Sequence, residues 1–530
     1  MLRRSSTHSG RLVCFETLES RSLLAGNVMV AVNSGELDIT GDNANNSIQV
    51  TQLTSGQWKV TGIATKINNG SSPFITDSAD PVTGNIQIQL SGGSDTVNVS
   101  HGTVPGALLI DADDNPPTMF DGNDIVQVSN ITTGLDTLGT GQSLHIVLGK
   151  GNNIATVTGC TTSGSTEIDS DTGNSQFVMS NDTINGGDSA FNGIFPGQGS
   201  SVISLSNVKW TAGDNGLNEI DLLLPGKSTI SLSNVSMTVG NGGLNGVLTH
   251  GPQTTIALTN VTMTGGIQSD NTINPGPGTS TISLVNVSMT TGDNNDGNRI
   301  VAGSGKALIS MSHVNMHAGS QTGNLVHTQD GTSTIIMSKV QMTCVIDCGN
   351  DVTTGNGNST IVMSGVTMST QGFGGNTVQS GDGKAVLTLA NINMSCGADG
   401  GNIITTGNSN AVISLVNSSL MANGTPSSNE IQTGAGNDVV SLVRVNATGD
   451  LAISTGDGTD AVSLNSVNVG PSDLSVDVGP GNYDSLAVVN CTAGTEELSD
   501  TGGTNGTIVG AANHFAAPPT VSGFRYRIGI

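Results

Sequence analysis

STISLSNVSMT (228–238), TTIALTNVTMT (254–264) and STISLVNVSMT (280–290) are successive copies of one pattern. In each copy apolar and polar residues alternate, which is typical of a half-buried β-strand. One asparagine, Asn234 in the first copy, interrupts the alternation, which then resumes. A third short run follows a turn of glycine and asparagine, as at 245–249. Each copy therefore predicts three short strands joined by three turns.

The pattern keeps a nearly constant period along the chain. A period of roughly 20–50 residues is typical of solenoids and other repeat proteins. Weaker copies before and after the central region raise the number of candidate coils to sixteen. One asparagine per copy marks the central period, in steps of 26 or 27 residues, at Asn192, Asn218, Asn245, Asn271, Asn298, Asn324, Asn350, Asn376, Asn402 and Asn429.

We therefore predict an all-β fold, a single right-handed parallel β-helix with three short strands per coil, about 26 residues per coil and roughly sixteen coils. The right-handed winding is expected because crossovers between parallel strands are almost always right-handed. At about 4.8 Å per coil, the helix would form a rod of roughly 75–80 Å. Asparagines in register at a turn are expected to stack as a ladder that holds neighbouring coils together.

The apolar columns of the repeat predict a continuous interior. Methionine recurs in phase, and the alternation of the strand places it inward, next to valine. Thioethers can bind Cu(I), but core packing is the favoured interpretation because methionine fills irregular gaps. The column comprises Met237, Met263, Met289, Met316, Met342, Met368 and Met394.

The regularity of the pattern divides the chain into four parts. Residues 1–26 lack the repeat and are expected to be a targeting segment that is disordered or removed. Residues 27–90 carry irregular strand patterns and are expected to form an N-terminal cap, before the β-helix at 91–500. Residues 501–530 concentrate aromatic residues and are expected to cap the last coil. Open β-edges invite polymerisation, so incomplete capping would allow self-association through the ends.

The charge of the chain restricts its partners. Sixteen Lys and Arg against forty-one Asp and Glu give a net charge of −25. This balance, without any basic patch, argues against nucleic acid and repels acidic polysaccharides. No run of about twenty apolar residues predicts a membrane span.

The N-terminal segment FETLESRSLLAG (15–26) carries a short motif. It resembles the LEPR-XLL motif at the N-termini of large exported or cell-surface proteins of planctomycete bacteria. Ser20 stands where that motif usually has proline. The resemblance covers about a dozen residues and implies export or surface placement rather than an activity. The matching residues are Leu18, Glu19, Arg21, Leu23 and Leu24.

Glycine-rich turns that end in aspartate are the strongest candidates for a metal site. Turns such as GAGND and GDGTD resemble single copies of the calcium-binding nonapeptide of RTX repeats, and Ca²⁺ takes 6–8 oxygen ligands. Here the motif recurs every 22–29 residues rather than every nine, and the central coils replace the aspartate. The alternative is that aspartate serves only as a turn residue. The candidate Ca²⁺ ligands are Asp438, Asp460, Asp484, Asp124 and Asp95.

Cysteine pairing stays open at the level of sequence. The chain has six cysteines, and Cys344 and Cys348 are separated by only three residues. This pair predicts either a small disulfide loop or half of a metal site, although a structural zinc site needs four ligands.

Catalytic motifs such as HExxH and GxSxG do not occur. We therefore expect a non-catalytic extracellular or cell-surface protein with a structural or adhesive role. Its expected partners are components of the cell envelope or extracellular matrix, polysaccharide among them. Two alternatives are a Ca²⁺-dependent binding module and a β-helix enzyme that cleaves polysaccharides as a lyase or hydrolase.

Overall fold

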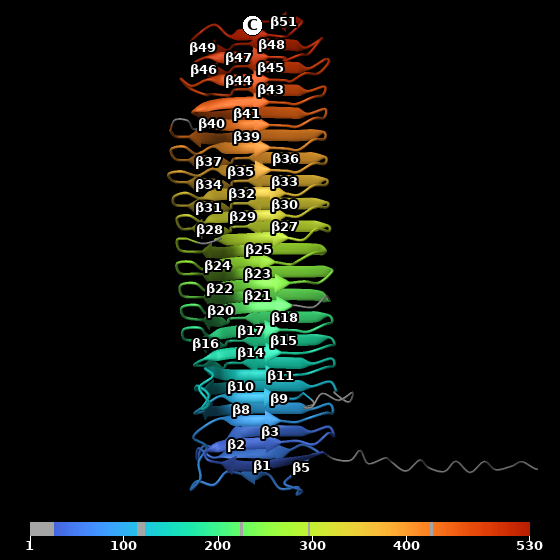
Figure 1. Cartoon of the computed structure of the whole chain (residues 1–530), viewed down its shortest axis with the longest axis vertical. Coiled ribbons are helices and arrows are strands. Elements are labelled where there is room, and N and C mark those ends of the chain that lie inside the picture. The colour runs from blue at the N-terminus through green and yellow to red at the C-terminus, as the bar shows by residue number, and fades with distance from the viewer. Residues whose placement is uncertain (1–25, 114–121, 223–225, 295–296, 425–427, 530) are drawn as a thin grey trace, which may run out of the picture.

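The computed structural model describes residues 26–113, 122–222, 226–294, 297–424 and 428–529, and within these ranges the chain forms strands and turns but no helix. The strands wind into a single rod in which each coil stacks on the previous one (Figure 1). The rod is a parallel β-solenoid of about 16 coils with about 26 residues each, which confirms the predicted fold. No helix in the described ranges is long and apolar enough to cross a membrane.

One coil illustrates the repeat. It contains β27 (Ala307–Ser312), β28 (Asn315–Ala318) and β29 (Gly323–Thr328), and the next coil begins with β30 (Ser333–Ser338). Between β27 and β28 the chain turns at His313, whose backbone is left-handed with φ of 54°. Each strand pairs in parallel and in register with its counterpart in the next coil.

The first strands of the coils form one continuous parallel sheet. In several coils this strand bends at a left-handed residue and runs on into the second strand, as at Asn234. The first strands are β8 (Thr96–Val104), β10 (Ile125–Thr133), β12 (Ile154–Thr158), β15 (Ser175–Ser180), β18 (Ser201–Ser206), β21 (Lys227–Thr238), β23 (Gln253–Thr264), β25 (Thr279–Thr290), β27, β30, β33 (Ser359–Ser364), β36 (Ala385–Ala390), β39 (Ala411–Ala422), β41 (Val439–Thr448), β43 (Ala461–Asn465), β45 (Ser485–Val489), β48 (Thr507–Ala511) and β51 (Tyr526–Ile528).

The second strands, where they are separate, are shorter and extend the same sheet around the corner. They are β13 (Thr161–Thr162), β16 (Thr183–Asn185), β19 (Lys209–Thr211), β28, β31 (Gln341–Cys344), β34 (Thr367–Thr370) and β37 (Asn393–Cys396), with β46 (Thr492–Ala493) and β49 (His514–Phe515) as a separate pair.

The third strands form the second main sheet, called here the third-strand sheet, and it carries the candidate site. Its strands are β7 (Ile86–Gln89), β9 (Leu108–Asp111), β11 (Gln142–Val147), β14 (Ser165–Asp169), β17 (Phe191–Phe195), β20 (Leu217–Leu222), β22 (Leu244–Thr249), β24 (Asp270–Asn274), β26 (Asn298–Ala302), β29, β32 (Gly349–Thr354), β35 (Asn376–Gln379), β38 (Asn402–Thr405), β40 (Ser428–Gln432), β42 (Asp450–Ser454), β44 (Leu474–Asp477), β47 (Glu496–Ser499) and β50 (Thr520–Ser522).

The ends of the rod depart from the repeat. At the N-terminal end, β1 pairs antiparallel with β2, and β4 pairs antiparallel with both β3 and β6. At the C-terminal end Phe524 is buried, whereas Tyr526 and Ile528 on β51 are exposed. The strands of the N-terminal end are β1 (Asn27–Asn33), β2 (Glu36–Thr40), β3 (Ser47–Gln52), β4 (Trp58–Gly62), β5 (Lys66–Ile67) and β6 (Phe74–Ile75).

Inward side chains of all three strands fill one main hydrophobic core that runs the length of the rod, beside two small separate clusters. The methionine column lies fully buried within it, and this confirms its predicted packing role. Stacking places identical residues against one another, as Met263 pairs in register with Met237 and with Met289. Apolar burial along the axis therefore stabilises every coil through its two neighbours.

Candidate functional site

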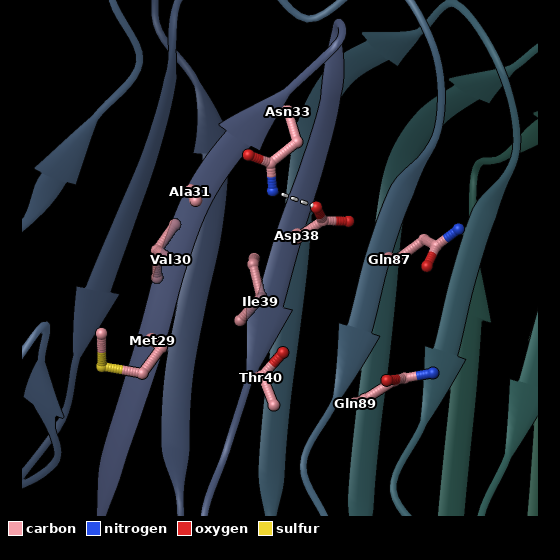
Figure 2. Close-up of a pocket in the computed structure, with 9 residues that line it drawn as sticks. All are labelled: Met29, Val30, Ala31, Asn33, Asp38, Ile39, Thr40, Gln87 and Gln89. Atoms are coloured by element: carbon pink, nitrogen blue, oxygen red, sulfur yellow. Dashed lines mark hydrogen bonds between the residues drawn. The ribbon is translucent and has the colours of Figure 1, made fainter.

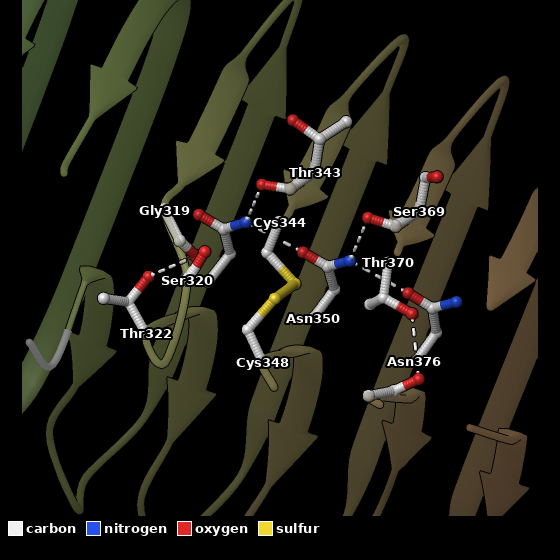
Figure 3. The surroundings of a disulfide bond; sticks show 12 residues. Gly319, Ser320, Thr322, Thr343, Cys344, Cys348, Asn350, Ser369, Thr370 and Asn376 are labelled. Atoms are coloured by element: carbon white, nitrogen blue, oxygen red, sulfur yellow. Dashed lines mark hydrogen bonds between the residues drawn. A yellow bond between two sulfur atoms is a disulfide. The ribbon is translucent and has the colours of Figure 1, made fainter. Parts of the chain in front are cut away.

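The ten periodic asparagines form an internal ladder at the start of the third strand. All ten are at most 1% exposed. Asn350, for example, donates from Nδ2 to Oδ1 of Asn376 at 2.9 Å and to the backbone carbonyl of Ser369 at 3.1 Å (Figure 3). Its own Oδ1 accepts from Nδ2 of Asn324 at 2.8 Å. The amides are therefore used by the fold and do not face a ligand.

A second asparagine ladder lies on the outside, at the corner between the first and second strands. Its members have left-handed backbones, and Asn234, Asn260 and Asn286 each donate to the amide oxygen of the preceding member at 2.9–3.0 Å. His313 and Lys339 interrupt the ladder but keep the left-handed turn. The turn geometry is therefore the constant feature here, and asparagine tolerates it well.

The predicted calcium ligands of the C-terminal coils occupy one inward position, just before the first strand. Asp438, Asp460 and Asp484 are at most 1% exposed. Asp438 accepts the backbone N–H of Ala411 at 2.7 Å, and Asp460 accepts that of Asp438 at 2.8 Å. Asp484 accepts the backbone N–H of Asp460 at 2.8 Å. One carboxylate oxygen of each residue thus joins two coils.

The N-terminal candidates occupy the same position in their own coils. Asp95 accepts the backbone N–H of Asn46 at 2.7 Å, and Asp124 accepts that of Asp95 at 2.8 Å. Asn153 continues the series, since its Oδ1 accepts the backbone N–H of Asp124 at 2.9 Å. Calcium binding by the five aspartates stays a prediction.

Burial changes the acidity of these carboxyl groups. Burial raises the pKa of Asp460 to about 6, and the negative charges of Asp438 and Asp484 add to the shift, although hydrogen bonds from the Asp438 backbone and Thr455 oppose it. Burial also raises the pKa of Asp438 and Asp484. Asp438, Asp460 and Asp484 therefore form a row inside the rod, and their carboxyl groups hold their protons more tightly than exposed aspartates do.

The cysteine pair forms a disulfide, so the first of the two predicted alternatives is confirmed. Cys344 ends β31 and Cys348 precedes β32, and their Cα atoms lie 6.1 Å apart (Figure 3). In the described ranges Cys160, Cys396 and Cys491 are free and buried. Cys14 and the LEPR-XLL-like residues lie outside the described residues.

The third-strand sheet brings together an acidic cluster that the sequence interpretation missed. His145 on β11 and Glu167 on β14 are neighbours in register, and Asp169 lies two residues further along β14 on the same outer face. Nε2 of His145 lies 3.0 Å from Oδ2 of Asp169 and 3.9 Å from Oε2 of Glu167. The three side chains are about one-quarter exposed.

The cluster raises the pKa of His145 and of the neighbouring acids alike. Burial lowers the pKa of His145, but the hydrogen bond to Asp169 and the charges of Glu167, Asp169 and Asp111 outweigh it, and the net effect raises this pKa. Burial raises the pKa of Glu167, and the charge of Asp169 adds to it. Burial likewise raises the pKa of Asp111.

An aromatic pair lies on the next coil. Phe191 and Phe195 of β17 stack with ring centroids 5.0 Å apart and planes inclined by 17°. The ring of Phe195 lies over Gly193, because a Cβ at Gly193 would come within 2.0 Å of the Phe195 Cε2 atom. A groove of about 430 Å³ opens beside Phe195 and is also lined by Val147 and Pro196.

A second pair of acids follows on β20. Glu219 pairs in register with Gly193, so this pair flanks the rings on the side opposite Glu167. Burial raises the pKa of Glu219 to about 7, and the charge of Asp221 contributes. His250 Nδ1 lies 3.6 Å from Oδ1 of Asp221.

Two carboxylate pairs thus flank one aromatic pair on three successive coils. We call this surface the acidic–aromatic face, and it comprises His145, Glu167, Asp169, Phe191, Phe195, Glu219 and Asp221. The sequence does carry a signal for it. The acids of the face lie one and three positions after the ladder position, as Glu219 and Asp221 follow Asn218. Phe195 lies three positions after Asn192.

The outward position of His145 recurs in register in each coil, and we call this series the outer row. It continues to the N-terminal end of the rod. Asp38 pairs with Gln87, Gln87 with Leu109, and Leu109 with His145. Around Asp38, β1, β2 and β7 line a groove of about 330 Å³, in which Asn33 donates to Asp38 at 2.6 Å (Figure 2). This groove has no aromatic platform, and its lining is mainly amide, hydroxyl and aliphatic.

No known protein family, curated protein or solved structure matches this chain.

Proposed function

We propose that this protein is a non-catalytic structural and adhesive rod that acts outside the cell or on its surface. The observation that carries the proposal is the internal asparagine ladder, which runs unbroken from Asn192 to Asn429. Each buried amide bonds the next coil, so the coils resist separation along the axis. Such a rod holds surfaces at a fixed distance from one another.

Two features support a location outside the cytoplasm. The Cys344–Cys348 disulfide is of a kind that persists in oxidising compartments. The N-terminal resemblance to LEPR-XLL proteins supports export in a planctomycete-like envelope.

The adhesive surface in this proposal is the acidic–aromatic face, and its partner is a neutral polysaccharide. Aromatic rings such as Phe191 and Phe195 offer an apolar surface to the C–H face of a sugar. Flanking carboxylates such as Glu167 and Glu219 accept hydrogen bonds from sugar hydroxyls, and bonds to charged acceptors are the stronger ones. The net charge of −25 disfavours acidic polymers.

Sedimentation with insoluble polysaccharides tests the proposal. The full chain is mixed with cellulose or chitin particles, the particles are spun down, and both retained protein and released sugar ends are measured. Adhesion predicts retention on at least one neutral surface without released sugar. Absence of retention on every surface contradicts the adhesive role.

A polysaccharide hydrolase is the second candidate, and the raised pKa of Glu219 favours it. The backbones of Glu167 and Glu219 lie two coils apart, roughly 9.6 Å at the strand spacing, so the two carboxyl groups would have to lean towards each other to reach the separation of about 6.5–9.5 Å in inverting glycosidases. Glu219, with a pKa of about 7, would serve as the general acid. Released sugar that disappears in Glu219→Gln but persists in Glu430→Gln, which alters the same outer row, would establish this candidate instead.

A further inference from the structure

The cluster on β11 and β14 has the composition of a transition-metal site. His145, Glu167 and Asp169 each offer one potential ligand atom, and these atoms lie within 4.8 Å of one another. Among the residues that the structure describes, this is the only group of three or more histidine, cysteine or acidic side chains arranged in this way.

The distances within the cluster suit a shared ion. Donors that bind one metal at about 2.0–2.2 Å lie roughly 3.0–3.4 Å apart when the angle at the metal is between square and tetrahedral. His145 Nε2 and Asp169 Oδ2 are already 3.0 Å apart, whereas the 3.9 Å between His145 Nε2 and Glu167 Oε2 would have to shorten when an ion binds. The backbone positions are fixed because β11 and β14 pair in register.

The surroundings support the ligands. On the other side of the imidazole, Nδ1 of His145 lies 3.4 Å from Nε2 of Gln142. When Nε2 binds an ion, Nδ1 carries the ring proton, so the Gln142 amide must turn its oxygen towards Nδ1 and accept that proton, as outer partners of metal-bound histidines do. The charge of Asp111 acts on His145 as well, which leaves an excess of negative charge around the cluster. Partial exposure leaves room for an ion to enter and for water to complete its coordination.

We propose that His145, Glu167 and Asp169 bind a divalent transition-metal ion of the Zn²⁺ type. The imidazole decides the class of metal, because Ca²⁺ and Mg²⁺ prefer oxygen donors alone, whereas Zn²⁺ accepts nitrogen and oxygen together. The site is distinct from the predicted calcium position, since Asp460 and its counterparts face the interior. The proposed metal site does not depend on the proposed adhesive role of the protein.

Calorimetric titration of the full chain with ZnCl₂ tests the site. A Cys14→Ser background removes a thiol whose surroundings are outside the described structure. We expect one tight site per chain, weakened about tenfold or more by His145→Ala and by Asp169→Asn. His250→Ala is the matched control, because His250 faces Asp221 but lacks a third donor, and it should leave binding unchanged.

Three outcomes overturn the proposal. The first is equal Zn²⁺ binding by the parent chain and His145→Ala, which would identify the cluster as a plain ion pair. The second is a loss of Zn²⁺ affinity in His250→Ala as large as that in His145→Ala, which would indicate non-specific binding to histidines. The third is displacement of Zn²⁺ by millimolar Ca²⁺, which would exclude the nitrogen ligand. Circular dichroism of each variant confirms that it is folded. Because the titration contains no polysaccharide, its result is separate from the adhesion test.

Discussion

The side-chain amide of Asn324 donates to the amide oxygen of Asn350 across 2.8 Å, one coil further along the rod. Asn324 also donates to the backbone carbonyl of Thr343 at 2.9 Å and accepts from Asn298 at 2.8 Å. A single residue thus links three coils. Because the amide is buried, the loss of any of these bonds leaves a polar group with neither a protein partner nor a water molecule to bond to.

Asn324→Leu should therefore destabilise the rod by about 1–3 kcal/mol, the cost of leaving buried polar groups unpaired. The free energy of unfolding from urea denaturation measures this loss. Asn286→Gly is the control, since Asn286 belongs to the exposed outer ladder and glycine accepts its left-handed backbone. If both variants lose the same stability, the internal ladder has no special role.

Asp460→Asn should stabilise the protein at neutral pH. The pKa of Asp460 rises from 3.8 to about 6 in the fold, so the folded state holds the proton more tightly than the unfolded one. Stability is then lost as pH rises from about 4 through 6. Asparagine removes this loss, and Asn153 already fills the same position while donating to two backbone carbonyls. Thermal unfolding should show a gain at pH 7.5 that shrinks towards pH 4.

The same variant tests the calcium hypothesis. If Asp460 binds Ca²⁺, the ion should raise the unfolding temperature of the parent chain, and Asp460→Asn should reduce that rise. If neither Ca²⁺ nor a chelator moves the unfolding temperature, the five aspartates serve the fold alone.

Removing the disulfide should have a modest and local effect. It closes a loop with a sequence separation of 4 between Cys344 and Cys348, and the chain-entropy model gives about 2 kcal/mol for so short a loop. Denaturation of Cys344→Ser/Cys348→Ser measures the loss. A reductant should lower the stability of the parent chain to that of the double variant, and should not affect the variant itself.

Gly193→Ala should disrupt the aromatic pair without unfolding the rod. The added Cβ would lie within 2.0 Å of the Phe195 ring, which can move outward. Retention on neutral polysaccharide should fall while the unfolding temperature stays nearly constant. Gly246→Ala is a close control on the same outer row, because the nearest atom to its new Cβ is 3.4 Å away on Glu219.

The sequence was sufficient to predict the solenoid, because a period sustained by Asn192 through Asn429 leaves few other arrangements. It also placed the methionine column correctly, since alternation along a strand fixes which side chains point inward. The sequence alone did not distinguish the buried asparagine ladder from the exposed one. Both recur with the same period, and only the structure shows that Asn234 is exposed whereas Asn245 is buried.

The candidate site was missed for a different reason. His145, Glu167 and Glu219 lie far apart in sequence, and the coils around His145 depart from the central period. Their position on one outer face depends on strand register, including a local irregularity between Gln142 and Leu144. The disulfide was left open because its formation requires the Cα separation of Cys344 and Cys348, which the spacing alone does not define.

Carboxyl footprinting of the full chain on polysaccharide particles tests most directly that the acidic–aromatic face is the adhesive surface. A carbodiimide and an amine label exposed acids, and mass spectrometry reports the labelling of each residue with and without the particles. We expect that Glu167, Asp169 and Glu219 are protected, while Glu430, in the same outer row but far along the rod, is labelled equally in both states. Equal labelling of all four on a surface that retains the protein would contradict it.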